Sequence, residues 1–114
     1  MFGLCAWFLE CYLYCQSDIR FEDQVVAAVE KCVQTFGGLD ILINNASAIW
    51  PRPTLDTNMK KYDLMNTVNA RGTYLTSRVC LPYLLESAKR VSMKLYQKQP
   101  KAYICCRNLV NNTF

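Results

Sequence analysis

Apolar residues recur at helical spacing in the stretch that follows Asp18. The steps between them are mostly three or four residues, which places them on one face of a helix, while the charged residues lie mostly off that face. We predict that Asp18 caps the start of this helix and that Gly37-Gly38 ends it, because glycine accepts the left-handed conformation common at helix ends. The apolar positions are Phe21, Val25, Val26, Val29, Cys32, Val33 and Phe36.

A short apolar run from Leu39 to Asn45 follows the two glycines. Its β-branched residues and its apolar character on both faces are typical of a strand buried inside a parallel sheet. We therefore predict a strand in the interior of a sheet. A helix, a glycine turn and a buried strand in this order indicate the α/β class.

A second helix is predicted from about Met59 to Leu85, with Thr57 as its cap and with fraying at Pro82. Gly72, near its middle, would let another backbone approach closely. On pattern alone, Asn69 is more often a tolerated or exposed helix residue than a functional one. Helical spacing places five residues on one face of this helix: Tyr62, Met65, Asn69, Gly72 and Thr76.

The ends of the chain differ from its middle, which predicts three parts. Residues 1–17 form an apolar N-terminal segment that includes a strand near Tyr12 to Gln16. The segment is shorter than the roughly 20 apolar residues of a membrane span, and it lacks the features of a signal peptide. Residues 18–87 carry the regular pattern. Residues 88–114 form a divergent basic tail with one short apolar run, Ala102 to Cys106.

The composition narrows the function classes. The chain has 114 residues, 52% of them apolar, which indicates one small globular domain and excludes a disordered chain. The net charge of +4 is not gathered into basic runs, so we expect no nucleic-acid partner. No stretch is long enough to predict a membrane span.

The chemistry available to the chain is limited because the sequence contains no histidine. This excludes a Ser-His-Asp triad, a Cys-His pair and a histidine-ligated metal. The seven cysteines contain no C-x-x-C pair, so we expect no metal site and no disulfide framework. We expect reduced cysteines that act as small apolar residues in an intracellular protein.

Two motifs carry a resemblance to a known family. Asn44-Asn45-Ala46-Ser47 resembles the N-N-A-G signature of short-chain dehydrogenases/reductases, and the segment from Asn69 to Gly72 resembles their N-x-x-G helix signature. Asp18-Ile19-Arg20 resembles the acidic element after the family's third strand. The resemblance covers about Asp18 to Leu85. It implies an α/β fold: a partial Rossmann-type, doubly wound parallel sheet that lacks the first βαβ unit and the catalytic helix.

The resemblance also implies a cofactor, NADP or NAD, and a role for each matching residue. Asp18 would accept a hydrogen bond from the adenine amino group. Asn44, Asn45 and Ala46 would shape the strand end beside the cofactor's ribose, and Asn44 would also join neighbouring strands. Asn69 would hold a water of the proton relay. The ordinary alternatives are a helix cap, a turn and a satisfied amide. Ser47 stands where the family usually has glycine.

Other family motifs have no match among these residues. The family binds pyrophosphate on a T-G-x-x-x-G-x-G turn, but the four glycines here are Gly3, Gly37, Gly38 and Gly72. Proton donation in the family needs a tyrosine with lysine four residues later, and none of the seven tyrosines has one. We therefore expect an inactive chain whose cofactor binding is very weak.

We expect a truncated piece of a dehydrogenase, arising from alternative splicing or from an error in gene prediction. In the family's strand order, 3-2-1-4-5-6-7, the strand at Ile41–Asn44 would lose its neighbours unless Ala102 to Cys106 imitates strand five. The alternative function is a non-catalytic interaction module, a homo- or hetero-oligomer formed through the 59–85 helix. The resemblance implies a peroxisome or mitochondrion, although the C-terminal residues are not a peroxisomal S-K-L-type signal.

Overall fold

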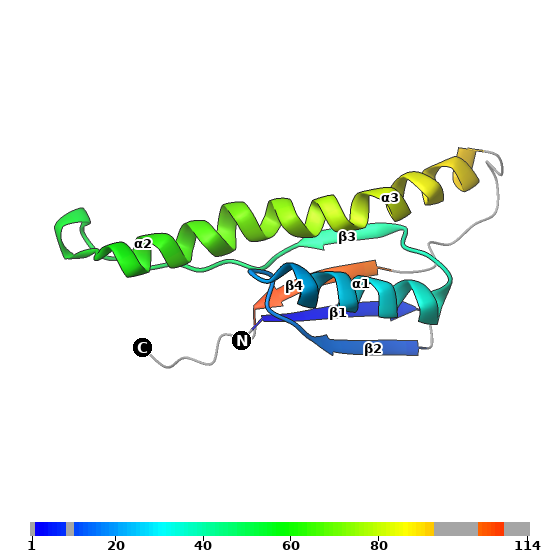
Figure 1. Cartoon of the computed structure of the whole chain (residues 1–114), viewed down its shortest axis with the longest axis horizontal. Helices are drawn as coiled ribbons and strands as arrows, with labels where there is room; N and C mark the ends of the chain where they lie inside the picture. Colours follow the sequence, from blue (N-terminus) through cyan, green and yellow to red (C-terminus); the bar gives the residue numbers. More distant parts are fainter. Residues whose placement is uncertain (1, 9–10, 93–102, 109–114) are drawn as a thin grey trace.

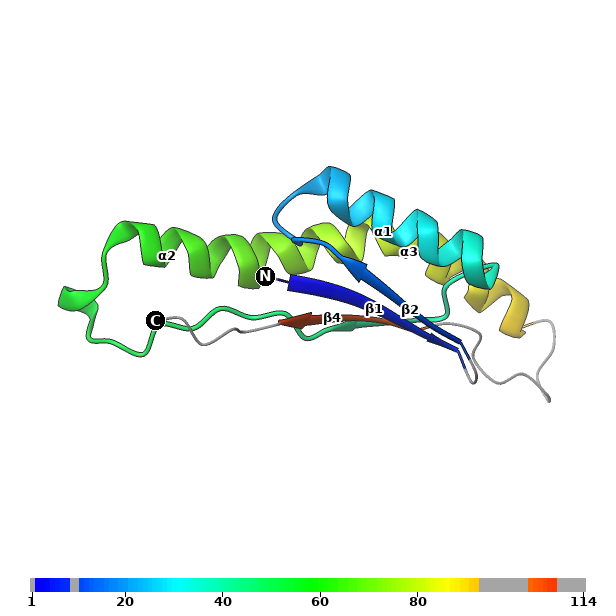
Figure 2. The ribbon, with the colours of Figure 1, turned by 90° about the horizontal axis from the view of Figure 1, so that it is seen from below.

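The computed structural model describes residues 2–8, 11–92 and 103–108, which form two layers. A four-stranded sheet makes one layer, and both long helices lie on the same side of it (Figures 1 and 2). The strands are β1 (Phe2–Phe8), β2 (Cys11–Gln16), β3 (Ile41–Asn44) and β4 (Tyr103–Asn108). The helices are α1 (Glu22–Phe36), α2 (Met59–Asn66) and α3 (Thr73–Ser92), with a 3-10 turn at Thr54–Asp56 and a π-helical segment at Thr67–Gly72.

The sheet has the strand order β2-β1-β4-β3. β1 is antiparallel to both β2 and β4, while β3 runs parallel to β4. β2 confirms the predicted strand near Tyr12 to Gln16. β3 confirms the strand after the two glycines, but the prediction that it lies inside the sheet was wrong. β3 is an edge strand, because β4 is its one partner among the described strands, and Ile43 is therefore 46% exposed.

β4 takes a different place from the one predicted for Ala102 to Cys106. In the order 3-2-1-4-5, two strands separate strand three from strand four. β2 and β3 match strands three and four by sequence, and β1 and β4 lie between them. β4 therefore stands in the position of strand one, not strand five. The prediction was wrong because β4 pairs with β3 on the side that faces β1 and β2, and not on the opposite side.

The sequence predicted the end of α1 correctly but not its start. Its N-cap residue is Phe21, with no side-chain cap, so the predicted cap by Asp18 was wrong. The Asp18 carboxylate instead accepts hydrogen bonds from Arg20. The predicted end at Gly37 is confirmed: its φ is 74°, and its N–H donates to the Val33 carbonyl at 2.8 Å.

The second helix is longer and less regular than predicted. Asn58, not Thr57, caps it, since the Asn58 side chain accepts a hydrogen bond from the Lys61 N–H at 3.0 Å. The helix widens into the π-helical segment and then continues as α3 to Ser92, so the predicted fraying at Pro82 was wrong. Pro82 lies on the exposed side of α3, where water can take the place of the missing N–H.

The core lies between the helices and the sheet. The side chain of Ile19, which precedes α1, is buried against Gly72, where an added Cβ would lie 2.7 Å from Ile19 Cδ1. Gly72 is a point of close approach, but the prediction that another backbone lies there was wrong, because the Ile19 side chain takes that place. None of the described helices combines the length and apolar character needed to cross a bilayer. The most deeply buried apolar residues are Ile19, Val25, Val29, Cys32, Leu39, Val68, Cys80 and Ile104.

Candidate functional site

The π-helical segment places Asn69 against the chain that leaves β3. The Asn69 Oδ1 accepts a hydrogen bond from the Ala48 N–H at 2.7 Å, and its Nδ2 donates to the Ala48 carbonyl at 2.8 Å. A π-helical turn is wider than an α-helical turn, and such turns are frequent at functional sites. The segment thus joins the second helix to the loop that carries the N-N-A-S motif.

Asn44 ends β3 and also contacts the long helix. Its Nδ2 donates to Ser77 Oγ at 3.0 Å, and that hydroxyl in turn donates to the Thr73 carbonyl at 2.8 Å. The Asn44 side chain therefore joins the strand to α3, while its backbone pairs with Cys106 of β4. Asn45 is exposed and Ala46 is buried. The structure brings Asn44, the motif loop and Asn69 to the same end of the parallel strand pair.

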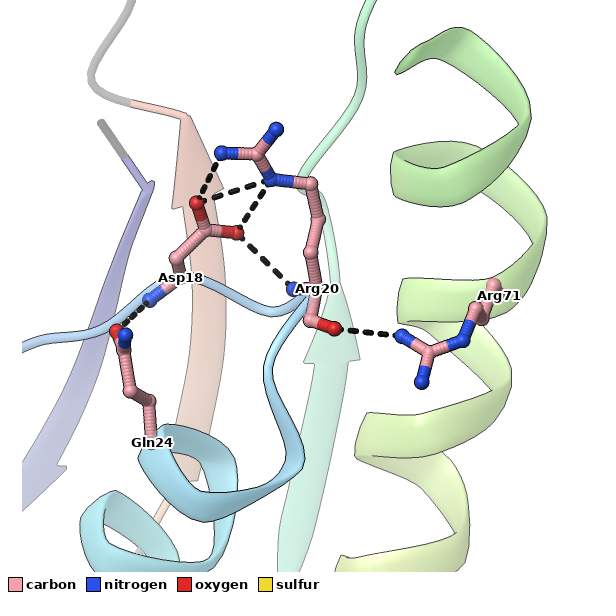
Figure 3. A network of polar contacts seen from close by, with 4 residues as sticks. All are labelled: Asp18, Arg20, Gln24 and Arg71. Atoms are coloured by element: carbon pink, nitrogen blue, oxygen red, sulfur yellow. Dashed lines mark hydrogen bonds and ion pairs between the residues drawn. The ribbon is translucent and has the colours of Figure 1, made fainter. Parts of the chain in front are cut away.

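Asp18 lies at the end of β2, in a network that Figure 3 shows from close by. Asp18 Oδ1 accepts from the Arg20 backbone N–H at 3.0 Å and from Arg20 Nε at 2.9 Å. Asp18 Oδ2 accepts from Arg20 Nε at 2.9 Å and from Nη2 at 2.5 Å. The Asp18 N–H donates to Gln24 Oε1 at 2.8 Å, which connects the same residue to α1.

The Asp18–Arg20 pair shifts the protonation of both groups. Burial acts to raise the pKa of the Asp18 carboxyl, but the hydrogen bonds and positive charge of Arg20 outweigh it and leave the pKa below its ordinary value. The pKa of Arg20 is raised, because its hydrogen bonds to Asp18 stabilise the guanidinium. Near pH 7 the pair is therefore a carboxylate bound to a cation.

Arg71 connects this network to the π-helical segment. Its Nη1 donates to the Arg20 carbonyl at 2.5 Å (Figure 3). Next to it in the chain, Gly72 receives the Ile19 side chain. Two adjacent residues of the π-helical segment thus hold the Asp18–Arg20 loop. The same segment holds the loop after β3 through Asn69, so it unites all the predicted site residues in one region.

Sequence reasoning missed three residues of this region: Arg20, Arg71 and Ser77. Arg71 lies inside the N-x-x-G motif and Arg20 inside the acidic element, so their positions carried a signal. Their partners did not, because Arg71 meets Arg20 across 51 residues of chain and Asn44 meets Ser77 across 33. Within the part of the chain that the structure describes, no group of histidine, cysteine and carboxylate side chains could hold a metal ion.

The comparisons with known proteins point to one family. A family model for short-chain dehydrogenases matches residues 9–92. Hydroxysteroid dehydrogenase-like protein 2 is 63% identical over 75 residues in Xenopus tropicalis and 59% identical in Homo sapiens. The match covers 66% of this chain but 18% of each relative, so the chain spans about a fifth of their length.

Solved structures give the same result. A dehydrogenase from Xanthomonas campestris is 62% identical, with a TM-score of 0.63 over 65% of this chain and 28% of that one. The 3-ketoacyl-(acyl-carrier-protein) reductase of Brucella melitensis, solved with NADH, is 34% identical, with a TM-score of 0.62 over 67% of this chain and 32% of that one. The chain belongs to the short-chain dehydrogenase family, as its two motifs predicted.

Proposed function

We propose that this 114-residue chain is an oxidoreductase-family protein that does not itself turn over NADP(H) or NAD(H). The observation that carries the proposal is the place of β4. It stands beside and parallel to β3, in the position of the family's first strand, which a glycine-rich phosphate turn follows. The six residues after β4, Leu109 to Phe114, contain none of the glycines on which that turn depends.

The described residues do not fit a dinucleotide cofactor well. The turn glycines exist so that pyrophosphate can reach bare backbone N–H groups at a helix N-terminus. The predicted adenine contact, the Asp18 carboxylate, is already bound to Arg20. Both the oxygen and the nitrogen of the side-chain amide of Asn69, the predicted relay residue, are hydrogen-bonded to the backbone of Ala48. Without a tyrosine–lysine pair in these residues, no proton donor of the family's kind is available.

Cofactor oxidation or reduction by the purified chain tests this proposal. The chain is mixed with NADPH or NADH and a 3-ketoacyl thioester, or with NADP or NAD and a hydroxysteroid, after the names of a neighbour and of its relatives. We expect no turnover above the protein-free rate. A rate that disappears in Asn69→Ala but persists in Asn66→Ala would overturn the proposal, because a contaminating enzyme would respond to neither change. Asn66 is a matched control, since its amide bonds within its own helix.

The alternative is a non-catalytic interaction module that acts through the second helix. The observation that favours it is a stripe of exposed apolar side chains along α3, comprising Tyr74, Leu81 and Leu85, which are 70%, 51% and 54% exposed. Their spacing places them on the helix side away from the core. We infer that this stripe is the contact surface of a homo- or hetero-oligomer.

The oligomeric state measured by light scattering tests the alternative. We expect Tyr74→Ser combined with Leu81→Ser to shift the assembly toward monomer, alone or in a mixture with a full-length relative. Leu55→Ser, which removes a fully exposed apolar side chain away from the stripe, is the control. An unchanged assembly in the double variant would exclude the stripe as the contact.

The location of the chain in the cell is a further part of the proposal. Its relatives by sequence are hydroxysteroid dehydrogenase-like proteins, and the resemblance to their family supports a peroxisome or a mitochondrion. Imaging of a tagged chain beside markers of both organelles tests this. A diffuse signal that overlaps neither marker would contradict it.

A further inference from the structure

We propose that Arg20 competes with external hydrogen-bond donors for the Asp18 carboxylate and thereby keeps a purine amino group from binding there. The proposal rests on the proposed function, in which Asp18 is the predicted contact of adenine. It goes further by naming the residue that prevents the contact. The blocked position follows from the geometry of the Asp18–Arg20 pair in Figure 3.

Three N–H groups of Arg20 occupy both oxygens of the Asp18 carboxylate, and the single Nε–H is shared between them. An ionised carboxylate has about four lone-pair positions, two on each oxygen. Oδ1 accepts from the Arg20 N–H at 3.0 Å and from Nε at 2.9 Å. Oδ2 accepts from Nε at 2.9 Å and from Nη2 at 2.5 Å. A ligand amino group would therefore compete with the donors of Arg20 for the same two oxygens.

Arg20 is held in this position from several sides. Its guanidinium lies 5.6 Å from the centroid of the Phe21 ring, which favours a cation over the ring face. Its carbonyl accepts the hydrogen bond of Arg71, and the preceding Ile19 is buried against Gly72. The backbone is thus fixed on both sides of the guanidinium stem, so Arg20 is already in place when a ligand arrives.

The rest of the position remains within reach of solvent. The Asp18 side chain keeps 19% of its surface exposed and the Arg20 side chain 35%. Burial therefore does not exclude a small ligand, but a ligand donor meets a carboxylate whose two oxygens already accept from Arg20. Removal of the guanidinium would leave Asp18 with the Arg20 backbone N–H as its one remaining partner from that residue.

The substitution Arg20→Met tests the proposal because it keeps an unbranched apolar stem and removes every side-chain donor. Adenosine is titrated into the full chain, and the backbone amide resonances of positions 19 and 20 are followed by NMR. We expect adenosine to bind the variant about tenfold more tightly than the original chain, since a hydrogen bond to a charged group is among the stronger ones. Adding Asp18→Ala to the variant should abolish the gain.

Arg78→Met is the matched control. It also removes one guanidinium and one ion pair, that of Arg78 with Glu22 at 3.4 Å, but it leaves Asp18 bound. Its adenosine affinity should equal that of the original chain. An equal gain in Arg78→Met would mean that net charge and not the Asp18 site determines binding, which would overturn the proposal.

Arg20→Lys keeps the test decisive if Arg20→Met does not fold, as judged by circular dichroism. An ammonium cannot bind both carboxylate oxygens as the planar guanidinium does, so part of the gain should appear. Adenosine binding no tighter than in the original chain, in whichever of the two variants is folded, would overturn the role of Arg20. Turnover of NADPH by the original chain would instead overturn the proposed function, so the two failures are distinguishable.

Discussion

The side-chain amide of Asn69 forms the same pair of hydrogen bonds with the Ala48 backbone that a neighbouring β-strand would form. It accepts from the Ala48 N–H at 2.7 Å and donates to the Ala48 carbonyl at 2.8 Å. The two residues are 21 positions apart, one in the π-helical segment and one in the loop after β3. The loop that carries the N-N-A-S motif has no strand partner at this point, and Asn69 supplies one. This structural task is independent of any catalytic step.

Asn69→Ala should therefore destabilise the chain even if the chain is inactive. Loss of the side chain removes two hydrogen bonds to the half-buried Ala48 backbone, each worth about 0.5–1.5 kcal/mol of unfolding free energy. Urea denaturation followed by circular dichroism measures the loss. Asn66→Ala, which removes an amide bonded within its own helix, should cost much less. Equal losses in the two variants would show that the hydrogen bonds of Asn69 to Ala48 add no more stability than a bond within a helix.

Gly72→Ala should also destabilise the chain. Alanine is the better helix former by about 1 kcal/mol, but its Cβ would lie 2.7 Å from Ile19 Cδ1, and such overpacking costs about 1–3 kcal/mol. Adding Ile19→Val removes Cδ1 but keeps Cγ1, which would lie 2.8 Å from the new Cβ, so it should recover part of the loss. A double variant no more stable than Gly72→Ala would mean that some other contact makes glycine necessary here.

Ile104→Ala tests the place of β4 in the sheet. Ile104 is 2% exposed between β1 and β3, so its truncation should cost about 2–5 kcal/mol of unfolding free energy. Ile43→Ala removes the same atoms from the neighbouring edge strand, where 46% of the residue is exposed, and should cost clearly less. The reverse order would place β4 outside the sheet.

The Asp18–Arg20 pair predicts a loss of stability in acid. The folded pKa of Asp18 lies below its ordinary value of 3.8, so its contribution is complete above that pH and disappears as the pH falls through the folded pKa. Unfolding free energies measured across this range should decrease toward low pH. Asp18→Asn should remove that part of the decrease, whereas an unchanged slope would show that other carboxylates produce it.

The buried thiol of Cys32 should make the chain less stable at alkaline pH. Burial, aided by the negative charge that Cys15 can carry, raises its pKa from 9.0 to about 11. Its contribution is therefore complete below the ordinary pKa and is lost as the pH rises toward the folded value. In the native chain Cys32 should resist alkylation more than half-buried Cys15. Mass spectrometry of iodoacetamide-treated chain checks this, and equal labelling would contradict it.

The elements that depend on nearby residues were predictable from the sequence, as were the family motifs. The end of α1 at Gly37 needed only the conformational freedom of glycine, and the strand after it needed only its apolar run. The cap of α1 was not predictable, because Asp18 could bond either the helix N-terminus or Arg20. Asp18 bonds Arg20, whose carbonyl also accepts a hydrogen bond from Arg71, 51 positions away along the chain. Adjacent Thr57 and Asn58 offered similar caps.

The position of β3 at the edge of the sheet could not be predicted from the sequence for a different reason. A four-residue strand reveals its apolar character but not the number of its neighbours, and those neighbours come from residues 2–8 and 103–108. The π-helical segment likewise depends on Ile19 and Ala48, which lie far from it in sequence. For the candidate site, the motifs predicted which residues gather near β3, while the Asp18–Arg20 bonds that occupy the carboxylate became visible only in three dimensions.

The pairing of β1 with β4 has a consequence for biosynthesis. The two strands are separated by almost the whole chain, yet β4 is the inner neighbour of both β1 and β3. On the ribosome the hairpin of β1 and β2, both helices and β3 are all synthesised before β4 exists. The sheet can close only after residues 103–108 emerge, and until then the nascent chain exposes two unpaired strand borders. Such late, non-local closure slows folding, and the open strand borders can pair with other chains until it is complete.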